Sequence, residues 1–462
     1  MPYLYYAEQA FLRRHLNHVQ HVTLDPGGPG VVRIHLIPQR RTLRRTPFLA
    51  VLNGQAVLPL GVSWAILLTC LIEALQPYEG KEVSDKEWTA ITRATLAAAG
   101  RVYRTTPQMQ LGADLELLLH TLRAAARGRA LPVAPPVLSL GDYAPHMLAP
   151  HRLDLMVSSM MADGAWHCNQ KCLHCYAAHQ PMAEVRELDT DQWLAILQKA
   201  RAAGVCQLTF TGGEPTLRTD LVELVRAARW FVTRLNTNGR MLTSLLCKDL
   251  YDASLDSVQI TLYSADEAAH NTLVGAAGFA DTVNGIRNAV AAGLNVSLNT
   301  PLCTANRNYR DTVEFAHSLG VRYLSCSGLI PAGGAATAES RATRLSPAAL
   351  ADVLRPAMDY ARAHGMEISF TSPGWLDDPT LAALGFTQFP TCGACLSNMA
   401  VAPDGTVLPC QSWLSGPGLG NLLQTPWHKI WDSAACAAVR GQSAKMLPRC
   451  QLGETPMREG CV

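Results

Sequence analysis

The sequence predicts an α/β protein: a partial (β/α)6 barrel, preceded by a small α+β domain and followed by a cysteine-rich module. Three observations lead to this prediction. Six apolar β-type runs alternate with helical segments in the middle of the chain, a hairpin and helices precede them, and six of the 14 cysteines lie in the last 71 residues. Apolar strands separated by helices form parallel sheets with right-handed crossovers, and six such units suit a barrel.

Composition excludes several classes of protein. The 39 Lys and Arg residues nearly balance the 37 Asp and Glu residues, so the net charge of +2 gives no general attraction to nucleic acid or to an anionic membrane. The most apolar stretch, residues 65–75, is shorter than the roughly 20 residues that a membrane-spanning helix needs. The N-terminus has no apolar signal core, so we expect a cytoplasmic protein with no nucleic-acid or membrane partner.

Residues 1–130 are expected to form the small α+β domain. Val31 to Ile37 alternates like a strand, and Asn53-Gly54 between two apolar runs predicts a hairpin. Helices are expected at 63–75, 84–99 and 111–127, the second opened by a capping box of Ser84 and Glu87. Residues 131–150 contain five prolines and are predicted to be a linker.

Residues 151–373 are expected to form the barrel. Strands are predicted at 153–157, 207–211, 232–237, 257–262, 295–299 and 323–326. Helices are predicted at 191–203, 220–228, 244–251, 279–292 and 309–319. This alternation stops near residue 374, and residues 374–462 are rich in Cys, Gly and Pro, which predicts a third module held together by metal.

The first chemical motif is Cys168-x3-Cys172-x2-Cys175, directly after the first predicted strand. Active sites of parallel barrels lie at this carboxyl end of the strands. Three thiolates can hold three irons of a four-iron cluster and leave the fourth iron open to a substrate. A structural zinc site, with His174 as the fourth ligand, is the alternative that the spacing alone leaves open.

The second motif, Thr211-Gly212-Gly213-Glu214-Pro215, ends the second predicted strand. Two glycines let a ligand approach the backbone closely, and a carboxylate accepts hydrogen bonds from an ammonium group. Alone, this motif is an ordinary strand-to-helix turn. Beside the three cysteines, at the same edge of the barrel, it is specific: over about residues 153–330 the sequence resembles the radical S-adenosylmethionine (radical SAM) enzymes.

The resemblance implies a role for each matching residue. Cys168, Cys172 and Cys175 would bind a reducible [4Fe-4S] cluster whose open iron chelates SAM, with Gly213 and Glu214 near the SAM amine. Further SAM contacts that the resemblance implies are His174 and Tyr176 near the adenine, with Thr211, Gly212, Thr237, Asn238 and Ser264 from the barrel edge. Electron transfer from the cluster would cleave SAM to methionine and a 5′-deoxyadenosyl radical, which removes hydrogen from an unactivated C–H bond.

The C-terminal cysteines resemble a SPASM domain. Cys392-x2-Cys395, a Pro-Asp-Gly turn and then Cys410 match the start of such a domain, but its usual tail of four closely spaced cysteines is reduced to Cys450 and Cys461. We therefore expect one auxiliary [4Fe-4S] cluster, ligated by the first three cysteines and either Cys461, which we favour, or Cys450. A second auxiliary cluster would need Cys436 or a non-cysteine ligand, and a zinc knuckle is the alternative to iron.

Cys303 and Cys326 lie at predicted strand ends, near the expected active-site edge. A thiol there could return a hydrogen atom to a substrate radical, so both are candidate catalytic hydrogen donors. Inert burial in the core is the alternative, because free cysteine is among the most buried residue types. Gln411 follows Cys410 where sulfatase-maturing relatives carry an acidic proton acceptor, which argues against that activity.

These features predict an oxidoreductase that matures a ribosomally synthesised peptide by a crosslink, a thioether or an epimerisation. In the order of its elements the N-terminal domain resembles PqqD-like winged-helix modules, which bind a leader segment by strand addition. A flavodoxin or ferredoxin would supply electrons. The alternatives are the same chemistry on a small molecule or tetrapyrrole, and a non-catalytic Fe–S or zinc-binding protein. The Gly-Gly-Glu-Pro turn argues against the last, because a redox carrier needs no ammonium-binding turn.

Overall fold

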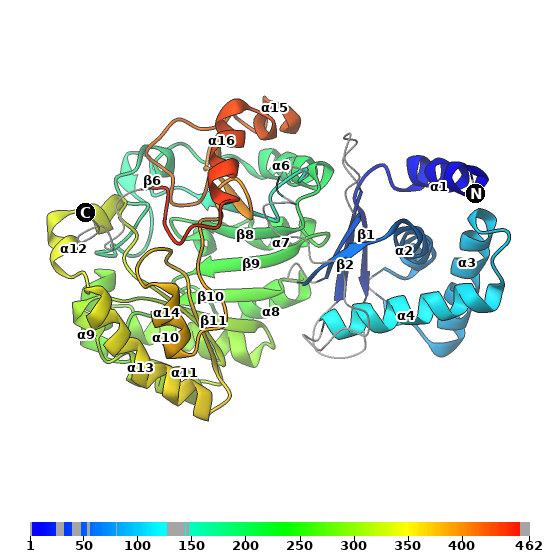
Figure 1. Cartoon of the computed structure of the whole chain (residues 1–462). Coiled ribbons are helices and arrows are strands. Elements are labelled where there is room, and N and C mark those ends of the chain that lie inside the picture. The colour runs from blue at the N-terminus through cyan, green and yellow to red at the C-terminus, as the bar shows by residue number, and fades with distance from the viewer. Residues whose placement is uncertain are drawn as a thin grey trace. The chain divides into compact units, whose positions relative to one another are not determined.

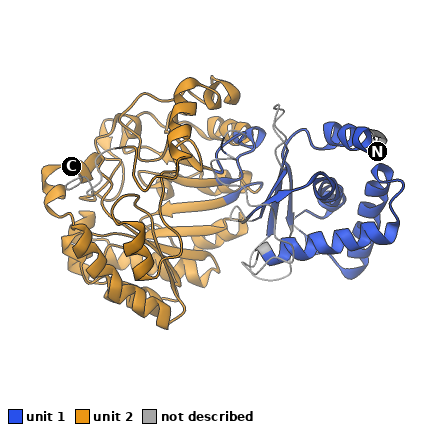
Figure 2. Ribbon diagram, viewed as in Figure 1, with its two compact units in different colours: residues 1–151, 200–207, 230–232 blue, residues 152–199, 208–229, 233–462 orange. Residues whose placement is uncertain are grey.

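The chain forms two compact units, shown in Figure 2. Unit 1 holds residues 1–151, 200–207 and 230–232, and unit 2 holds residues 152–199, 208–229 and 233–462. The structure is a computed structural model and describes residues 2–24, 32–38, 48–52, 56–79, 81–126, 144 and 147–452.

Unit 1 contains a four-stranded antiparallel sheet in the order β1-β2-β3-β4. Its strands are β1 (Gln20–Leu24), β2 (Val32–Ile37), β3 (Phe48–Leu52) and β4 (Ala56–Leu60). The pairing of Leu52 with Ala56 confirms the predicted hairpin, whose Asn53-Gly54 turn lies outside the described residues. β1 has no counterpart in the sequence-based prediction.

Among the described residues, four α-helices accompany this sheet. They are α1 (Pro2–His15), α2 (Val62–Leu75), α3 (Asp85–Val102) and α4 (Gln108–Ala126), with a short 3-10 turn η1 (Gln76–Tyr78) after α2. The predicted capping box opens α3: Ser84 Oγ accepts a hydrogen bond from Glu87 N, and the Glu87 carboxylate accepts one from Ser84 N at 2.9 Å. Side chains of α2 and the sheet share one apolar core, so unit 1 is the small α+β domain that the sequence predicts.

Unit 2 is built on a nine-stranded sheet in the order β13-β12-β11-β10-β9-β8-β5-β14-β15. The six predicted barrel strands stand together within it, close to their predicted bounds. They are β5 (Arg152–Ser158), β8 (Gln207–Gly212), β9 (Val232–Thr237), β10 (Ser257–Thr261), β11 (Asn295–Pro301) and β12 (Tyr323–Ser327). The pairs from β9 to β13 (Glu367–Phe370) are parallel, and Figure 1 shows β8 to β11 side by side. This is the predicted partial barrel.

Helices connect the strands of the barrel. They are α6 (Thr190–Ala203), α7 (Leu221–Ala227), α8 (Ser244–Asp252), α9 (Glu267–Val274), α10 (Phe279–Ala291), α11 (Tyr309–Ser318), α12 (Ala338–Ala342) and α13 (Pro347–Ala363). Short 3-10 turns are η3 (Pro181–Ala183), η4 (Pro215–Leu217), η5 (Thr304–Asn306) and η6 (Gly333–Ala336), and β6 (Met161–Ala162) with β7 (Ala165–Trp166) forms a small hairpin. No helix among the described residues is long and apolar enough to cross a bilayer.

The C-terminal module continues the barrel sheet. It contains α14 (Asp378–Leu384), β14 (Asn398–Val401), β15 (Val407–Leu408), α15 (Trp427–Trp431) and α16 (Ala434–Ser443). β14 pairs in parallel with β5, from Asn398 opposite Arg152 to Val401 opposite Leu155, and β15 pairs antiparallel with β14. Buried residues of this hairpin share a core with Met156 on β5. The predicted cysteine-rich module is therefore hydrogen-bonded to the first barrel strand.

Candidate active site

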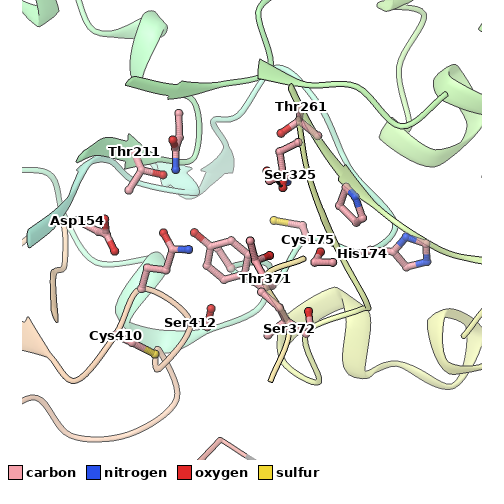
Figure 3. A pocket seen from close by; sticks show the side chains of 18 of the residues that line it. Asp154, His174, Cys175, Thr211, Thr261, Ser325, Thr371, Ser372, Cys410 and Ser412 are labelled. Carbon is pink, nitrogen blue, oxygen red and sulfur yellow. Dashed lines mark hydrogen bonds between the residues drawn. The ribbon is translucent and has the colours of Figure 1, made fainter. Parts of the chain in front are cut away.

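A cavity of about 510 Å³ occupies the barrel of unit 2, and Figure 3 shows part of its lining. Alternate residues of each barrel strand face it, because side chains on a strand alternate between the two faces of the sheet. The side chains that face the lumen are polar, among them Asp154, Thr209, Asn236, Gln259, Asn299 and Ser325. Since the interior of a complete barrel is filled with packed branched apolar side chains, this hollow polar lumen is a binding site.

The first cysteine motif lies at one end of the cavity, and all three thiols line it. Backbone hydrogen bonds hold the loop: Lys171 N donates to Val274 O and Leu173 N to Leu273 O, both at the end of α9. The Cys168 thiol donates to Gly213 O at 3.5 Å, which brings the two sequence motifs together as predicted. Burial raises the pKa of Cys168 to about 12, so the thiol holds its proton until a metal displaces it.

The two motif glycines serve close packing of the chain against itself. A Cβ on Gly212, whose φ is +141°, would lie 2.1 Å from Ser158 O, and a Cβ on Gly213 would lie 2.6 Å from Ser159 O. The sequence-based prediction explained these glycines by the need for a ligand to approach the backbone closely. The structure adds a second reason for them: the end of β8 needs both glycines in order to lie against the end of β5.

Glu214 is buried with 1% of its surface exposed, and its carboxylate accepts four hydrogen bonds. Oε1 accepts from Thr216 N at 3.0 Å, from Thr216 Oγ1 and from Thr237 Oγ1 at 2.6 Å, and Oε2 accepts from Asn238 N at 2.8 Å. Burial raises the pKa of Glu214, and the four donors oppose that rise. Glu214 thus ties the turn after β8 to the end of β9, and only Oε2 keeps room for another donor.

Most other residues predicted to contact SAM line the same cavity, namely His174, Tyr176, Thr211, Gly212, Gly213, Thr237 and Asn238. His174 Nε2 lies 2.8 Å from Thr343 Oγ1, and burial lowers the pKa of His174 to about 4, so its ring is neutral near pH 7. Ser264 is absent from the lining among the described residues. Its hydroxyl accepts from Asp266 N at 3.0 Å in the turn before α9.

Cys303 and Cys326 lie in the core. Both are fully buried, and neither occurs among the described residues that line the cavity. Cys303 precedes the 3-10 turn η5, where its backbone N–H donates to Asn306 Oδ1, and the Cys326 thiol donates to Ser369 O. A hydrogen donor must reach the substrate, so this placement favours the inert-core alternative for both thiols.

The C-terminal cysteines divide into two groups. Cys392, Cys410 and Cys450 line the cavity that Cys168, Cys172 and Cys175 also line, whereas Cys461 lies outside the described residues. Cys395 is fully buried and contacts the thiol of Cys436 on α16. The pKa of Cys436 is lowered, because it accepts from Cys395 and lies 3.3 Å from Arg440 Nη1.

The Pro-Asp-Gly turn forms the predicted hairpin between β14 and β15, with Gly405 at a φ of +87°. Because Cys395 N donates to Pro409 O at 2.9 Å, this hairpin brings Cys410 next to the Cys392–Cys395 segment. Among the described residues, no three His, Cys, Asp or Glu side chains are arranged to hold a single metal ion.

Three charged lumen residues were missed by the sequence-based prediction. Arg152 Nε donates to Asp154 Oδ1 at 2.8 Å and Arg152 Nη2 to Asp154 Oδ2 at 3.2 Å, and Arg234 on β9 also lines the cavity. The signal was present in the sequence: Arg152 and Asp154 stand two residues apart on β5, and Arg234 and Asn236 stand two residues apart on β9. Alternation places them on one face of the sheet.

Comparisons with known proteins agree with this geometry. The sequence model of the radical SAM superfamily matches residues 167–319, and the model of an iron–sulfur cluster-binding SPASM domain matches residues 392–452. A PqqA peptide cyclase of Streptomyces rochei is 33% identical over 58% of this chain and 75% of its own length. Another from Ruegeria pomeroyi is 30% identical over 65% of this chain and 79% of its own length.

Solved structures share the fold at low sequence identity. Streptococcus suis SuiB bound to the precursor peptide SuiA aligns with a TM-score of 0.57 and 14% identity, covering 89% of this chain and 93% of SuiB. The enzyme anSMEcpe with bound AdoMet aligns with a TM-score of 0.51 and 17% identity, covering 64% of this chain and 84% of its own.

Proposed function

The chain belongs to the radical SAM superfamily, and from this premise we propose that it matures a ribosomally synthesised peptide. It is an enzyme that uses SAM, a SAM-binding [4Fe-4S] cluster and an auxiliary iron–sulfur cluster. The peptide substrate is supported by the curated relatives, which are peptide cyclases, and by the fold shared with a protein solved with its precursor peptide.

The observation that carries the proposal is one cavity with cysteines of both modules in its wall. Cys168, Cys172 and Cys175 line it together with Cys392, Cys410 and Cys450, and a polar lumen lies within it. A peptide side chain that enters this lumen is within reach of both cluster sites. The reaction requires this, because hydrogen is removed from the substrate at the SAM site and an electron must then leave the substrate through the auxiliary site.

We assign the cysteines by the part of the chain to which they belong. Cys168, Cys172 and Cys175 hold the SAM-binding cluster, which when bound and reduced supplies the electron that converts SAM to methionine and a hydrogen-abstracting 5′-deoxyadenosyl radical. The auxiliary cluster takes its ligands from Cys392, Cys395, Cys410 and either Cys450 or Cys461. Cys395 must then turn from Cys436 towards the cluster.

The remaining residues of the site bind and orient SAM. Gly213 O and the free position on Glu214 Oε2 are the acceptors available for its amine, since the other acceptor positions of the Glu214 carboxylate are used. His174 and Tyr176 lie in the same wall, and they would flank the adenine. Because burial lowers the pKa of His174 to about 4, its ring would add no positive charge to the site of the cationic SAM.

Unit 1 binds the leader of the peptide. Among the described strands of unit 1, β4 stands at one end of the sheet and pairs only with β3, so its outer side is an edge to which a strand can be added. Val57 on β4 keeps 38% of its surface exposed and offers apolar contact. Electrons come from a flavodoxin or ferredoxin of the cytoplasm.

The test uses full-length protein with reconstituted clusters, reduced under anaerobic conditions with SAM and synthetic peptides encoded by short reading frames beside the gene. Mass spectrometry should show 5′-deoxyadenosine together with a peptide that has lost two hydrogens, or that gains deuterium from D2O if it is epimerised. The matched control is Cys168→Ala. A 5′-deoxyadenosine yield that rises with a small molecule but with none of the peptides would overturn the proposal.

A further inference from the structure

The two sides of the barrel lumen differ in how their polar groups are satisfied. On β10 to β12 the lumen side chains bond to one another: Gln259 Nε2 donates to Ser325 Oγ at 3.1 Å, and Ser325 Oγ donates to Asn299 Oδ1 at 2.9 Å. On β9 they do not. Asn236 Oδ1 is buried without a hydrogen-bond partner, and Arg234 stands two residues before it on the same face of the strand.

Arg234 also lacks a partner for its charge. Within the described part of the chain its guanidinium makes no hydrogen bond or ion pair. The nearby Asp154 acts on Arg234 only through its charge, and its hydrogen bonds, of 2.8 and 3.2 Å, come from Arg152. Burial and the neighbouring Arg152 lower the pKa of Arg234. A guanidinium nevertheless stays charged, since its ordinary pKa is above about 12. Two cations and one carboxylate leave this end of the lumen with one excess positive charge, which is costly in a partly buried site.

Neither cofactor supplies the missing anion. Arg234 is four residues before Asn238 on β9, about 13 Å along the strand from the SAM-binding edge. The auxiliary site is closer to the other arginine: Cys410 acts electrostatically on Arg152, whereas the charges that act on Arg234 are those of Arg152 and Asp154. The partner of Arg234 must therefore arrive with the substrate.

Asn236 restricts the chemical class of the anion that can bind to Arg234. Its orphan oxygen needs a donor, which a fully ionised sulfate does not bring and a phosphate brings only in its protonated forms, whereas an amino-acid residue always carries a backbone N–H together with its carboxylate. Guanidinium groups bind carboxylates through two parallel hydrogen bonds. Resting on the proposed peptide function, we propose that Arg234 and Asn236 form a carboxylate-recognition subsite that anchors an acidic residue of the peptide, or its C-terminal carboxylate, in the barrel lumen.

The test measures binding, apart from turnover. The probes are N-acetyl-L-glutamate N-methylamide, its glutamine analogue, N-acetyl-dialanine and N-acetyl-dialanine N-methylamide, titrated into full-length, cluster-loaded protein with SAM. The acid of at least one pair should bind about tenfold or more tightly than its amide, as expected for a hydrogen-bonded charge pair. A preference within the first pair identifies a side-chain carboxylate, and one within the second pair identifies the C-terminus.

Substitutions test whether Arg234 causes the preference for the acid over the amide. Arg234→Met should abolish the preference for the acid, Arg234→Lys should retain part of it, and Arg355→Met, which removes an exposed arginine of α13, should leave it unchanged. Iron content and melting temperature check that each variant is folded, and Arg234→Lys keeps the test valid if Arg234→Met does not fold.

If the unmodified protein binds the acid and the amide of both pairs equally well, the proposed carboxylate-recognition subsite is refuted, even if the protein matures peptides. A preference for the acid without maturation of any peptide would leave the carboxylate site standing and contradict the peptide function.

Discussion

Replacing Glu214 by Gln should destabilise unit 2 before SAM is bound. The Gln amide oxygen can still accept from Thr216 and Thr237, but its NH2 group then faces the backbone N–H of Asn238, which loses its acceptor. An unsatisfied buried donor costs about 1–3 kcal/mol, and bonds to a neutral acceptor are weaker than bonds to a charged one. The Gln side chain is neutral and therefore avoids the cost of burying a charged carboxylate, a cost that also raises the pKa of Glu214. This gain offsets part of the lost stability. We expect a net loss of about 2 kcal/mol in the free energy of unfolding.

The assay is urea unfolding of the full chain without SAM, followed by tryptophan fluorescence, with Glu223→Gln on α7 as the control. Glu223 is exposed, so its substitution should move the midpoint little. SAM affinity is measured in parallel by calorimetry. An unchanged unfolding midpoint for Glu214→Gln, combined with weaker SAM binding, would refute the reasoning, because Glu214 would then act only as an acceptor for the SAM amine.

Three further expectations concern the cysteines, Gly212 and His270. Replacing Cys168, Cys172 and Cys175 together by Ala should remove about four irons and abolish 5′-deoxyadenosine formation. Adding either Cys450→Ala or Cys461→Ala should then remove the remaining iron, and the substitution that does so identifies the fourth auxiliary ligand. Gly212→Ala should destabilise by about 3 kcal/mol in urea unfolding, because its Cβ would lie 2.1 Å from Ser158 O at a φ of +141°, and wild-type stability would contradict the packing role. His270 is fully buried and burial lowers its pKa to about 4, so its neutral form is favoured in the folded state. Stability is therefore complete above about pH 6.5 and falls by about 3 kcal/mol as the pH drops towards 4, and His270→Leu should flatten that dependence.

The barrel strands could be predicted because each is an apolar run bounded by turn residues, a local signal. β14 and β15, with four and two residues, are too short to carry a periodic pattern. The place of β14 beside β5 depends on pairing between segments more than 200 residues apart, which no local pattern encodes.

The parts of the candidate site that lie in contiguous motifs could also be predicted from the sequence. The cysteine and Gly-Gly-Glu-Pro motifs are contiguous, and the structure brings them together. The core placement of Cys326 could also have been predicted, since Ser325 and Ser327 face the lumen and the residue between them must face away. The contact of Cys395 with Cys436 and the excess charge at Arg234 arise only from tertiary packing.

The pairing of β14 with β5 has a consequence for engineering. β5 leads into the loop of the first three cysteines, and β14 leads through the Pro-Asp-Gly turn to Cys410, so a continuous backbone hydrogen-bond ladder sets the spacing between the two iron-binding regions. A chimera that imports the tail of a relative at residue 374 must therefore bring an edge strand that fits β5 in register. A graft that slips by one residue would turn every side chain of that strand to the opposite face and displace Cys410 from the cavity.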